Sequence, residues 1–427
     1  MTAAGSGQRP SGARAVVVAR HARLWLVPAV LASLVALFLS LLYMGGIVHP
    51  DDSLHRLPIA LVDDDQGPPL PGQQQPVGEQ LSRAITASTP STAVRWRRLD
   101  QTRMQDELAS GKVYGALVVP AGFSGSVRAL TTALATARPT LTVLTNPGLG
   151  SLGSSLASQI SQGAARRGSL MIGRQLTARA AAGGANPTLR ALLADPVAVV
   201  VRPGHPIGRH SGLGLTAFYY TLLLVLTAFV GGNIINNGVD AGLGYTDNEI
   251  GPWHSRRPTV PISRTQTLLL KMIMTAGIVL LTTGLTMIAT IAVLGMDASH
   301  IPLLWIFSYC ASLTVGLGVQ AINAAFGGIG QVVSMFVFIA LALPSSGATV
   351  PLQAVPGFYR FLALFEPFRQ VTGGVRAILY FDARADAGLA RGWAMIGVGF
   401  AVALAFGFAL TRYYDRKGLH RLVSKET

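Results

Sequence analysis

The chain has 427 residues, of which 50% are hydrophobic and only 12% charged, and its formal net charge at pH 7 is +15. Soluble domains carry about a quarter charged residues, so this composition excludes an ordinary soluble protein and indicates a membrane protein. The basic excess does not predict nucleic-acid binding, because no basic block is interleaved with aromatic residues and most basic residues flank apolar segments.

Six apolar stretches are long enough to cross a bilayer, which takes roughly 20 apolar residues. They cover residues 24–48, 213–235, 272–294, 301–322, 331–350 and 393–410. The first stretch lacks a small-residue cleavage site, so we expect an uncleaved signal anchor. The fold class that follows is a polytopic α-helical membrane protein with six transmembrane helices, five of them in a membrane domain at 212–411.

Basic flanking residues predict the orientation. Residues 1–23, 238–266 and 412–427 are rich in arginine or lysine, and all three regions fall on one side if six helices cross. We therefore expect a multi-pass protein of a bacterial inner (plasma) membrane with both terminal tails in the cytoplasm. The loop at 351–391 opposes this rule, because it would lie outside and yet contains five arginines. Either it folds as re-entrant or interfacial helices whose arginines meet lipid headgroups, or one stretch does not cross.

Residues 49–211 alternate between strand-like and helix-like patterns. Strands are predicted at 58–63, 94–99, 113–120, 140–145 and 197–202, and helices at 77–86, 101–112, 123–134 and 152–182. We therefore expect a compact α/β domain of about 150 residues, inserted on the extracytoplasmic side between the first two transmembrane helices.

Motifs of catalysis are absent from the sequence. The acidic run Asp63–Asp65 follows a predicted strand and is either a cation site or a solvated turn. The histidines lack metal-site spacing, and neither a G-x-S-x-G elbow nor a phosphate-binding loop occurs. Cys310 has no partner for an intrachain disulfide. We expect no catalytic, cofactor or metal site, and therefore a transport-type protein rather than an enzyme.

The six apolar stretches contain no Asp, Glu, Lys, Arg or His, which argues against a self-contained proton-coupled pump. The polar residues in or bordering them are amides, which either hydrogen-bond between helices or contact a substrate. These residues are Asn233, Asn236, Asn237, Gln320, Asn323 and Gln331.

The loop at 238–266 mixes charges with an aromatic side chain. Such a loop is either a docking surface for a partner or a solvated connector. Its candidate docking residues are Tyr245, Asp247, Glu249, Trp253, Arg256 and Arg257.

The predicted layout, one helix, an external domain and five more helices, comes with several short motifs. They are PIALVDDDQG at 58–67, LASGKVYGALVVPAGFS at 108–124, LTAFYY at 215–220, GLGYTDNEIGP at 242–252 and FEPFRQ at 365–370. Together they resemble the type II ABC exporter permeases, in particular the YhgE/Pip (phage infection protein) and nitrosoguanidine-resistance-like branch.

This resemblance implies a permease subunit that works as a homodimer or heterodimer. A separate ATP-binding subunit would energise the export of an amphiphile such as a drug, lipid or envelope precursor. In these exporters the loop after the second helix holds a coupling helix, which implies that role for residues 243–253. Re-entrant helices precede the last span, which would suit 351–391 with its Glu366, Arg369 and Arg376. The alternative is a non-transporting membrane scaffold whose external domain binds cell-envelope partners.

Overall fold

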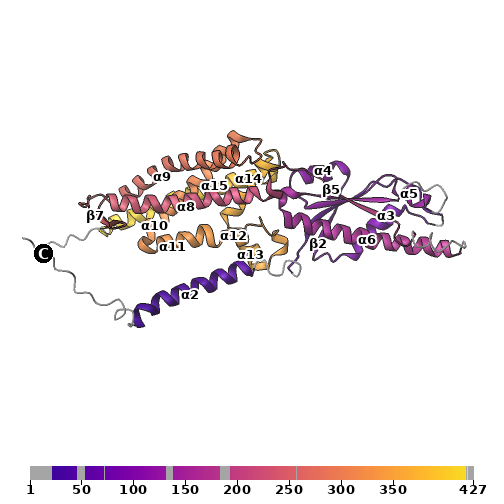
Figure 1. The fold of residues 1–427 in the computed structure, drawn as a ribbon, viewed down its shortest axis with the longest axis horizontal. Helices are drawn as coiled ribbons and strands as arrows, with labels where there is room; N and C mark the ends of the chain where they lie inside the picture. Colours follow the sequence, from indigo (N-terminus) through magenta and orange to yellow (C-terminus); the bar gives the residue numbers. More distant parts are fainter. Residues whose placement is uncertain are drawn as a thin grey trace, which may run out of the picture.

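The computed structural model describes residues 22–45, 53–71, 73–130, 138–182, 193–255, 257–419 and 421. Figure 1 shows an elongated molecule with a helical bundle at one end and a sheet domain at the other. Residues 1–21 of the predicted N-terminal tail, residues 420 and 422–427 of the C-terminal tail, and Arg256 lie outside the described residues.

All five strands of the larger sheet fall between residues 57 and 203, at the predicted places. They are β1 (Leu57–Asp63), β2 (Val94–Arg98), β3 (Gly115–Val119), β4 (Thr140–Thr145) and β5 (Ala198–Pro203). The order across the sheet is β2-β1-β3-β4-β5. Only the β3–β4 pair is antiparallel, so the sheet is mixed.

Helices pack on both faces of this sheet, because successive side chains of its strands point to opposite faces. Leu61 and Leu117 lie in a core with α3 (Val77–Ser88), α5 (Phe123–Ala129) and α6 (Ser151–Ala182). Neighbouring positions of the same strands, including Ala60 and Ala116, form a second core with α4 (Gln101–Ala109).

The acidic run at the end of β1 organises a turn. The carboxylate of Asp65 accepts hydrogen bonds from the backbone N–H of Gly67 at 3.1 Å and of Gly78 at 2.9 Å. It also accepts one from the Ser124 hydroxyl at 2.5 Å. Asp65 therefore joins the chain after β1 to the starts of α3 and α5.

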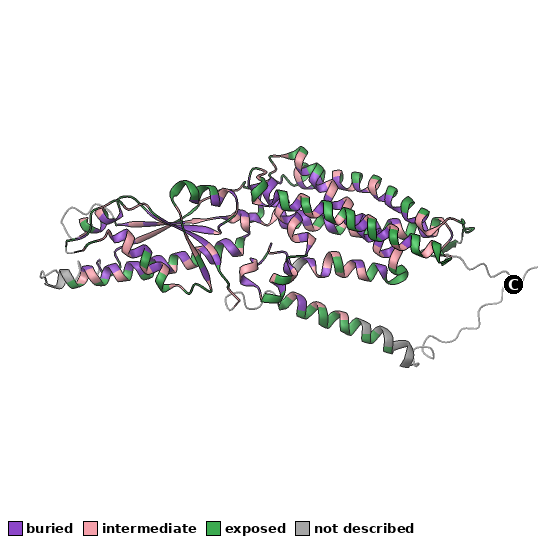
Figure 2. Cartoon of the chain, turned by 180° about the vertical axis from the view of Figure 1, so that it is seen from behind, coloured by how far each residue is buried: buried purple, intermediate pink, exposed green. Residues whose placement is uncertain are grey.

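Four helical stretches of the described chain are long and apolar enough to cross a membrane: Thr216–Gly242, Arg264–Val293, Ile301–Ala340 and Leu389–Arg416. Their outward side chains are exposed and apolar, for example Leu281 at 66% and Val398 at 60% exposure, and Figure 2 shows exposed positions along the outer sides of these helices. The chain is therefore a membrane protein. The predicted class with six transmembrane helices is wrong.

The two predicted stretches 301–322 and 331–350 do not form two full spans. The continuous helical run Ile301–Ala340 contains the long α10 (Ile301–Phe326), followed by α11 (Gly330–Met335) and the π-helical turns η5 (Phe336–Ala340), which together are shorter than the roughly 20 residues that a bilayer requires. The chain reverses after Gly327, which has a φ of 61°, and returns along α10, so that Phe338 packs against Gly318. Beyond residue 341 the predicted helix breaks up, because only the four-residue α12 (Ala342–Ser345) follows.

The first predicted stretch, 24–48, corresponds to the 23-residue helix α2 (Ala22–Met44). Its apolar part Ala32–Met44 exposes large side chains such as Leu34, Leu37 and Leu41.

The arginine-rich segment 351–391 consists of short helices, η6 (Leu352–Ala354), α13 (Gly357–Leu362), α14 (Pro367–Tyr380) and η7 (Ala385–Ala387). Several of its arginines have partners inside the protein. Arg360 donates to the carbonyl of Val355 at 2.8 Å, and Arg384 pairs with Asp106 at 2.8 Å. At least two of the arginines that count against the positive-inside rule therefore form hydrogen bonds or ion pairs within the protein.

The same segment joins the sheet domain to the bundle. Lys112 pairs with Asp386 at 2.7 Å, and the Tyr114 hydroxyl donates to Gln353 at 3.2 Å. The ring of Phe381 lies against Gly111 and Gly148, where an added Cβ would come within 3.2 Å and 2.9 Å of it. Sheet and bundle are therefore closely packed.

Candidate functional site

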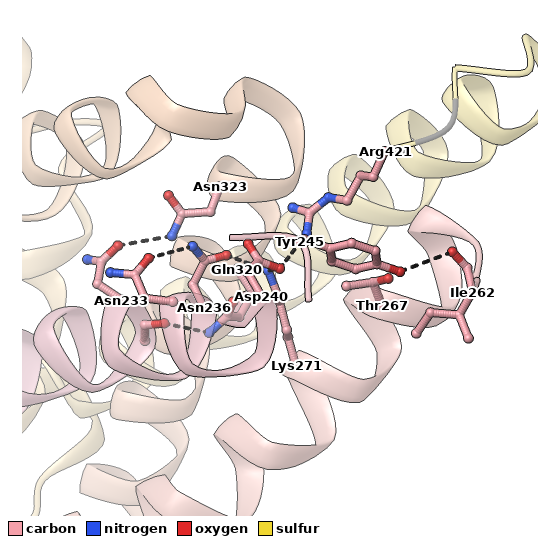
Figure 3. Close-up of polar contacts among 12 residues, drawn as sticks. Asn233, Asn236, Asp240, Tyr245, Ile262, Thr267, Lys271, Gln320, Asn323 and Arg421 are labelled. Carbon is pink, nitrogen blue, oxygen red and sulfur yellow. Dashed lines mark hydrogen bonds and ion pairs between the residues drawn. The ribbon is translucent and has the colours of Figure 1, made fainter. Parts of the chain in front are cut away.

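Four of the predicted amide residues meet inside the bundle, at the end farthest from the sheet domain. Asn233 and Asn236 lie on α8 (Thr216–Gly242), and Gln320 and Asn323 lie on α10. We call these four residues the amide cluster (Figure 3). Asn323 donates to Asn233 at 3.0 Å, and Gln320 donates to the carbonyl of Gly232 at 2.9 Å. The amides therefore hydrogen-bond between helices.

Small residues allow this close packing. A Cβ at Gly232 would lie 3.0 Å from Val319 on α10, and one at Gly316 would lie 2.6 Å from Thr275 on α9 (Arg264–Met287). Glycine at these positions lets the helix backbones approach, as in other membrane helix pairs. The approach brings Gln320 within 3.2 Å of the Thr275 hydroxyl.

Three charged residues continue the amide cluster toward the end of the bundle (Figure 3). The ammonium of Lys271 lies 2.7 Å from a carboxylate oxygen of Asp240 and donates to the Asn236 side chain at 2.7 Å. Arg421 pairs with the same oxygen of Asp240. We call Asp240, Lys271 and Arg421 the ionic cluster, in which two cations share one carboxylate.

The ionic cluster corrects the expectation of an uncharged bundle. The Lys271 side chain is 3% exposed and that of Asp240 12% exposed. Helix α9 begins at Arg264, about two turns before Lys271, so that this lysine lies inside the bundle rather than flanking it. The apolar stretches had bounds too narrow to include either residue.

Tyr245 connects the ionic cluster to the loop that follows α8. Its backbone N–H donates to the carbonyl of Asp240 at 2.8 Å, and its hydroxyl donates to the carbonyl of Val260 at 2.8 Å. The guanidinium of Arg421 lies over its ring, 5.3 Å from the centroid. Both ends of the loop are therefore held at the ionic cluster.

The middle of this loop is a β-hairpin of β6 (Asn248–Ile250) and β7 (Trp253–Ser255). A glycine with positive φ is favoured at the first position of a two-residue hairpin turn, and Gly251 has a φ of 60° there. Glu249 pairs in register with His254, whose ring lies 3.6 Å from Asp247. The expectation of a helix within residues 243–253 is therefore wrong, because this part of the loop is a hairpin. Trp253 is 76% exposed on it.

Further backbone contacts hold α9 against α15 (Leu389–Arg416) at this end. The Asp415 carboxylate accepts from the backbone N–H of Arg264 at 2.9 Å and of Thr265 at 3.0 Å. A carboxylate is favourable at a helix N-terminus, where the free N–H groups point at it. The Arg264 side chain in turn donates to the carbonyl of Leu419 at 2.6 Å.

The remaining candidates lie elsewhere. Asn237 is exposed and accepts a hydrogen bond from the Asn236 side chain at 3.1 Å, at the edge of the amide cluster. Gln331 is exposed away from the cluster, and Arg257 is exposed beyond the hairpin. Glu366 caps α14, because its carboxylate accepts from the N–H groups of Phe368 at 2.9 Å and Arg369 at 2.8 Å. Burial raises the pKa of this carboxyl group to about 7.

The sequence reasoning missed Asp240, Lys271 and Arg421 as site residues. One signal was available for Asp240, because Asn233, Asn236 and Asp240 follow one another at helical spacing. Arg421 carries no such signal, since it meets Asp240 across 181 positions of sequence.

A protein-family model of proteins of unknown function, DUF3533, matches residues 28–399. Neither the curated proteins nor the solved structures contain a significant match to this sequence. Since the family model spans most of the chain, the protein belongs to the DUF3533 family.

Proposed function

We propose that this protein is the membrane permease subunit of an ABC-type exporter for amphiphilic substrates, rather than an enzyme. A separate ATP-binding subunit docks on the β6–β7 hairpin. The observation that carries the proposal is the exposed Trp253 on a hairpin whose loop is tied through Tyr245 to buried charges of the bundle.

Trp253 and Glu249 supply the docking chemistry. Tryptophan is the residue type most enriched among the few side chains that carry the energy of protein interfaces, and charged partners around it add specificity. Burial of this indole, which is 76% exposed, against a partner would contribute favourable free energy of binding. The short hairpin presents it in a fixed geometry, which lowers the entropic cost of docking.

The ionic cluster supplies the coupling to the helices. Movement of the hairpin changes the position of Tyr245, and with it the stacked Arg421. Arg421 shares its carboxylate partner with Lys271, so its displacement changes the contact between α8 and α9. A buried ion pair with two alternative arrangements is a suitable bistable element for such a transition.

We place the hairpin in the cytoplasm and the sheet domain outside, in a bacterial inner membrane. The positive-inside rule supports this orientation. Cationic side chains concentrate at the hairpin end: Arg257, Arg264, Arg412, Arg416, Lys417 and Arg421. The sheet domain is attached to the opposite end of the bundle (Figure 1).

An apolar pocket of about 230 Å³ supports an amphiphilic substrate. It lies between α10, α14 and α15, where Gly318, Val371 and Gly399 are among its lining residues. The hydrocarbon part of an amphiphile matches this lining. The assembly would be a homodimer or heterodimer of such subunits.

Co-purification tests the docking. The tagged full-length protein is extracted in mild detergent, and bound ATP-binding subunits are quantified by mass spectrometry. Glu249→Ala with Trp253→Ala should remove the subunit, because truncation of interface anchors often costs about 2 kcal/mol or more each. The matched control is Glu79→Ala with Leu170→Ala, which removes an acid and an exposed apolar side chain from the sheet domain.

Equal recovery of the subunit with wild type, double variant and control would refute docking on the hairpin. If no ATP-binding subunit is recovered even after cross-linking in membranes, the exporter assignment fails and the scaffold alternative replaces it. The amount of membrane-inserted protein is measured first, so that a loss of folding is separated from a loss of docking.

Cysteine labelling in cells tests the orientation. In a Cys310→Ser background, Ser155→Cys on the exposed side of α6 should react with a membrane-impermeant maleimide from outside. Ser255→Cys on the hairpin should react only after permeabilisation, since it is exposed at the opposite end. The reverse pattern would overturn the orientation.

A further inference from the structure

A strongly positive cavity lies between the sheet domain and the bundle, away from the hairpin. Its volume is about 230 Å³, below the range of about 300–1,000 Å³ typical of pockets for drug-sized ligands. Lys112 lines it from the sheet side, and Arg369, Arg376 and Arg391 line it from the bundle side. None of the residues that line it is acidic.

Arg376 is the most buried of these cations. Its residue is 9% exposed, and one guanidinium nitrogen donates to the carbonyl of Ala348 at 2.9 Å. Its Nε has no hydrogen-bond partner among the described residues. Burial lowers the pKa of this guanidinium, but arginine stays charged in proteins. A buried cation without a carboxylate partner is costly, and a bound anion removes that cost.

Arg369 and Arg391 add charge at the same wall. Arg369 donates to the carbonyl of Ala363 at 3.1 Å. Burial, and then the nearby positive charge of Arg391, lower its pKa. Arg391 is exposed and makes no hydrogen bond or ion pair with any residue in the described part of the chain. An anion bound between the two guanidinium groups replaces their repulsion with attraction.

The acids nearest to this wall are already engaged. Asp386 pairs with Lys112 at 2.7 Å and with Arg384 at 3.1 Å. Glu366 faces the N-terminus of α14, where it accepts two backbone hydrogen bonds. Neither carboxylate neutralises Arg376 or Arg391, so the cavity retains unbalanced positive charge.

We propose that this cavity binds a phosphate-type anion. Guanidinium groups bind phosphate oxygens through paired, charge-assisted hydrogen bonds, and the cavity offers three of them. The anion is a lipid headgroup or free inorganic phosphate. The exposed rings of Phe358, Phe361 and Phe365, at 61–66% exposure, lie on the same segment, and exposed apolar side chains of this kind occur on helices that lie in the membrane–water interface.

Calorimetric titration of the purified full-length protein tests the site with two probes, short-chain phosphatidylglycerol and inorganic phosphate. Arg391→Gln is the main variant, because the exposed, unpaired arginine is not needed for folding. It should weaken binding about tenfold, the value of one lost charged hydrogen bond. Arg360→Gln is the control, since Arg360 belongs to the same segment but does not line the cavity.

Each outcome bears on the proposal. Saturable lipid binding that phosphate weakly displaces, and that Arg391→Gln reduces, supports a headgroup site. Phosphate binding without lipid binding, with the same dependence on Arg391, supports a site for the free anion. No saturable binding of either probe, or equal binding by Arg391→Gln and wild type, overturns the proposal. The test is independent of the ATP-binding subunit, because the hairpin lies at the opposite end of the bundle.

Discussion

The two ends of the bundle differ in the partners that their buried cationic side chains have. At the hairpin end, Asp240 lies between Lys271 and Arg421, and each cation contacts its carboxylate. At the sheet end, Arg376 is equally enclosed but has only backbone carbonyls as acceptors, and no acid lines its cavity. Cations that share a carboxylate hold helices together, whereas cations without a carboxylate partner retain the capacity to bind an anion.

The strongest test of this comparison is Asp240→Asn. The substitution leaves Lys271 and Arg421 without their counter-charge, and the loss of one partner of a buried pair costs about 3–5 kcal/mol. The free energy of unfolding, measured by titration with a denaturing detergent, should fall by that amount. Asp240→Asn with Lys271→Met should restore part of it, because the more deeply buried cation is then also absent. If Asp240→Asn has the same free energy of unfolding as wild type, the ionic cluster does not stabilise the fold.

Glu366 predicts a pH dependence at the sheet end. Its pKa in the folded protein is raised from 4.5 to about 7. The folded state therefore holds the proton more tightly than the unfolded state between these two values, and stability falls as the pH rises from about 4.5 to 7. The loss is on the order of 3 kcal/mol.

Thermal unfolding at pH 5.5 and pH 8 measures this effect. Glu366→Gln stays neutral and should have nearly the same unfolding temperature at pH 5.5 and pH 8. Wild type should have a lower unfolding temperature at pH 8 than at pH 5.5. An equally large pH effect in the variant would assign it to another group.

The amide cluster should contribute less. Asn323→Leu removes the 3.0 Å hydrogen bond to Asn233 and should cost about 1 kcal/mol. A double-mutant cycle with Asn233→Leu should give a coupling of about 0.6 kcal/mol, the average for interhelical hydrogen bonds in membranes. Gln331→Leu, at an exposed position, is the control and should leave stability unchanged. A coupling of zero would mean that the hydrogen bond between Asn323 and Asn233 does not stabilise the packing of α8 against α10.

Trp253→Ala should have the smallest effect on stability, within about 0.5 kcal/mol, because the indole is 76% exposed. Phe307→Ala, which removes a fully buried ring of α10, should cost about 3–5 kcal/mol in the same assay. A large loss with Trp253→Ala would mean that the hairpin is part of the folded core rather than a free docking surface.

Local patterns predicted the sheet domain well. Each predicted strand was found, because alternation along strands such as β4 and turn residues between elements are local signals. The predicted number of membrane spans was wrong, because the ends of these helices are not set by local signals. Apolar composition predicts burial in an apolar environment, but the reversal after Gly327 and the break beyond residue 341 depend on packing against α10.

The candidate site shows the same limit. The amides at Asn233 and Asn323 could be selected by type, because polar residues in apolar stretches are rare. Their pairing with one another, and the meeting of Asp240 with Arg421, depend on contacts between helices far apart in sequence. The positive cavity is also non-local, since Lys112 and Arg391 come from different parts of the molecule.

The packing between sheet and bundle has a consequence for protein engineering. Phe381 fills the space over Gly111 and Gly148, and Arg384 reaches Asp106. A chimera that takes its sheet domain from a relative must therefore also take residues 380–388, or the graft would bring mismatched surfaces together. Sequence drift on one side of this junction is likewise constrained by the other, so the two parts should evolve as a single unit.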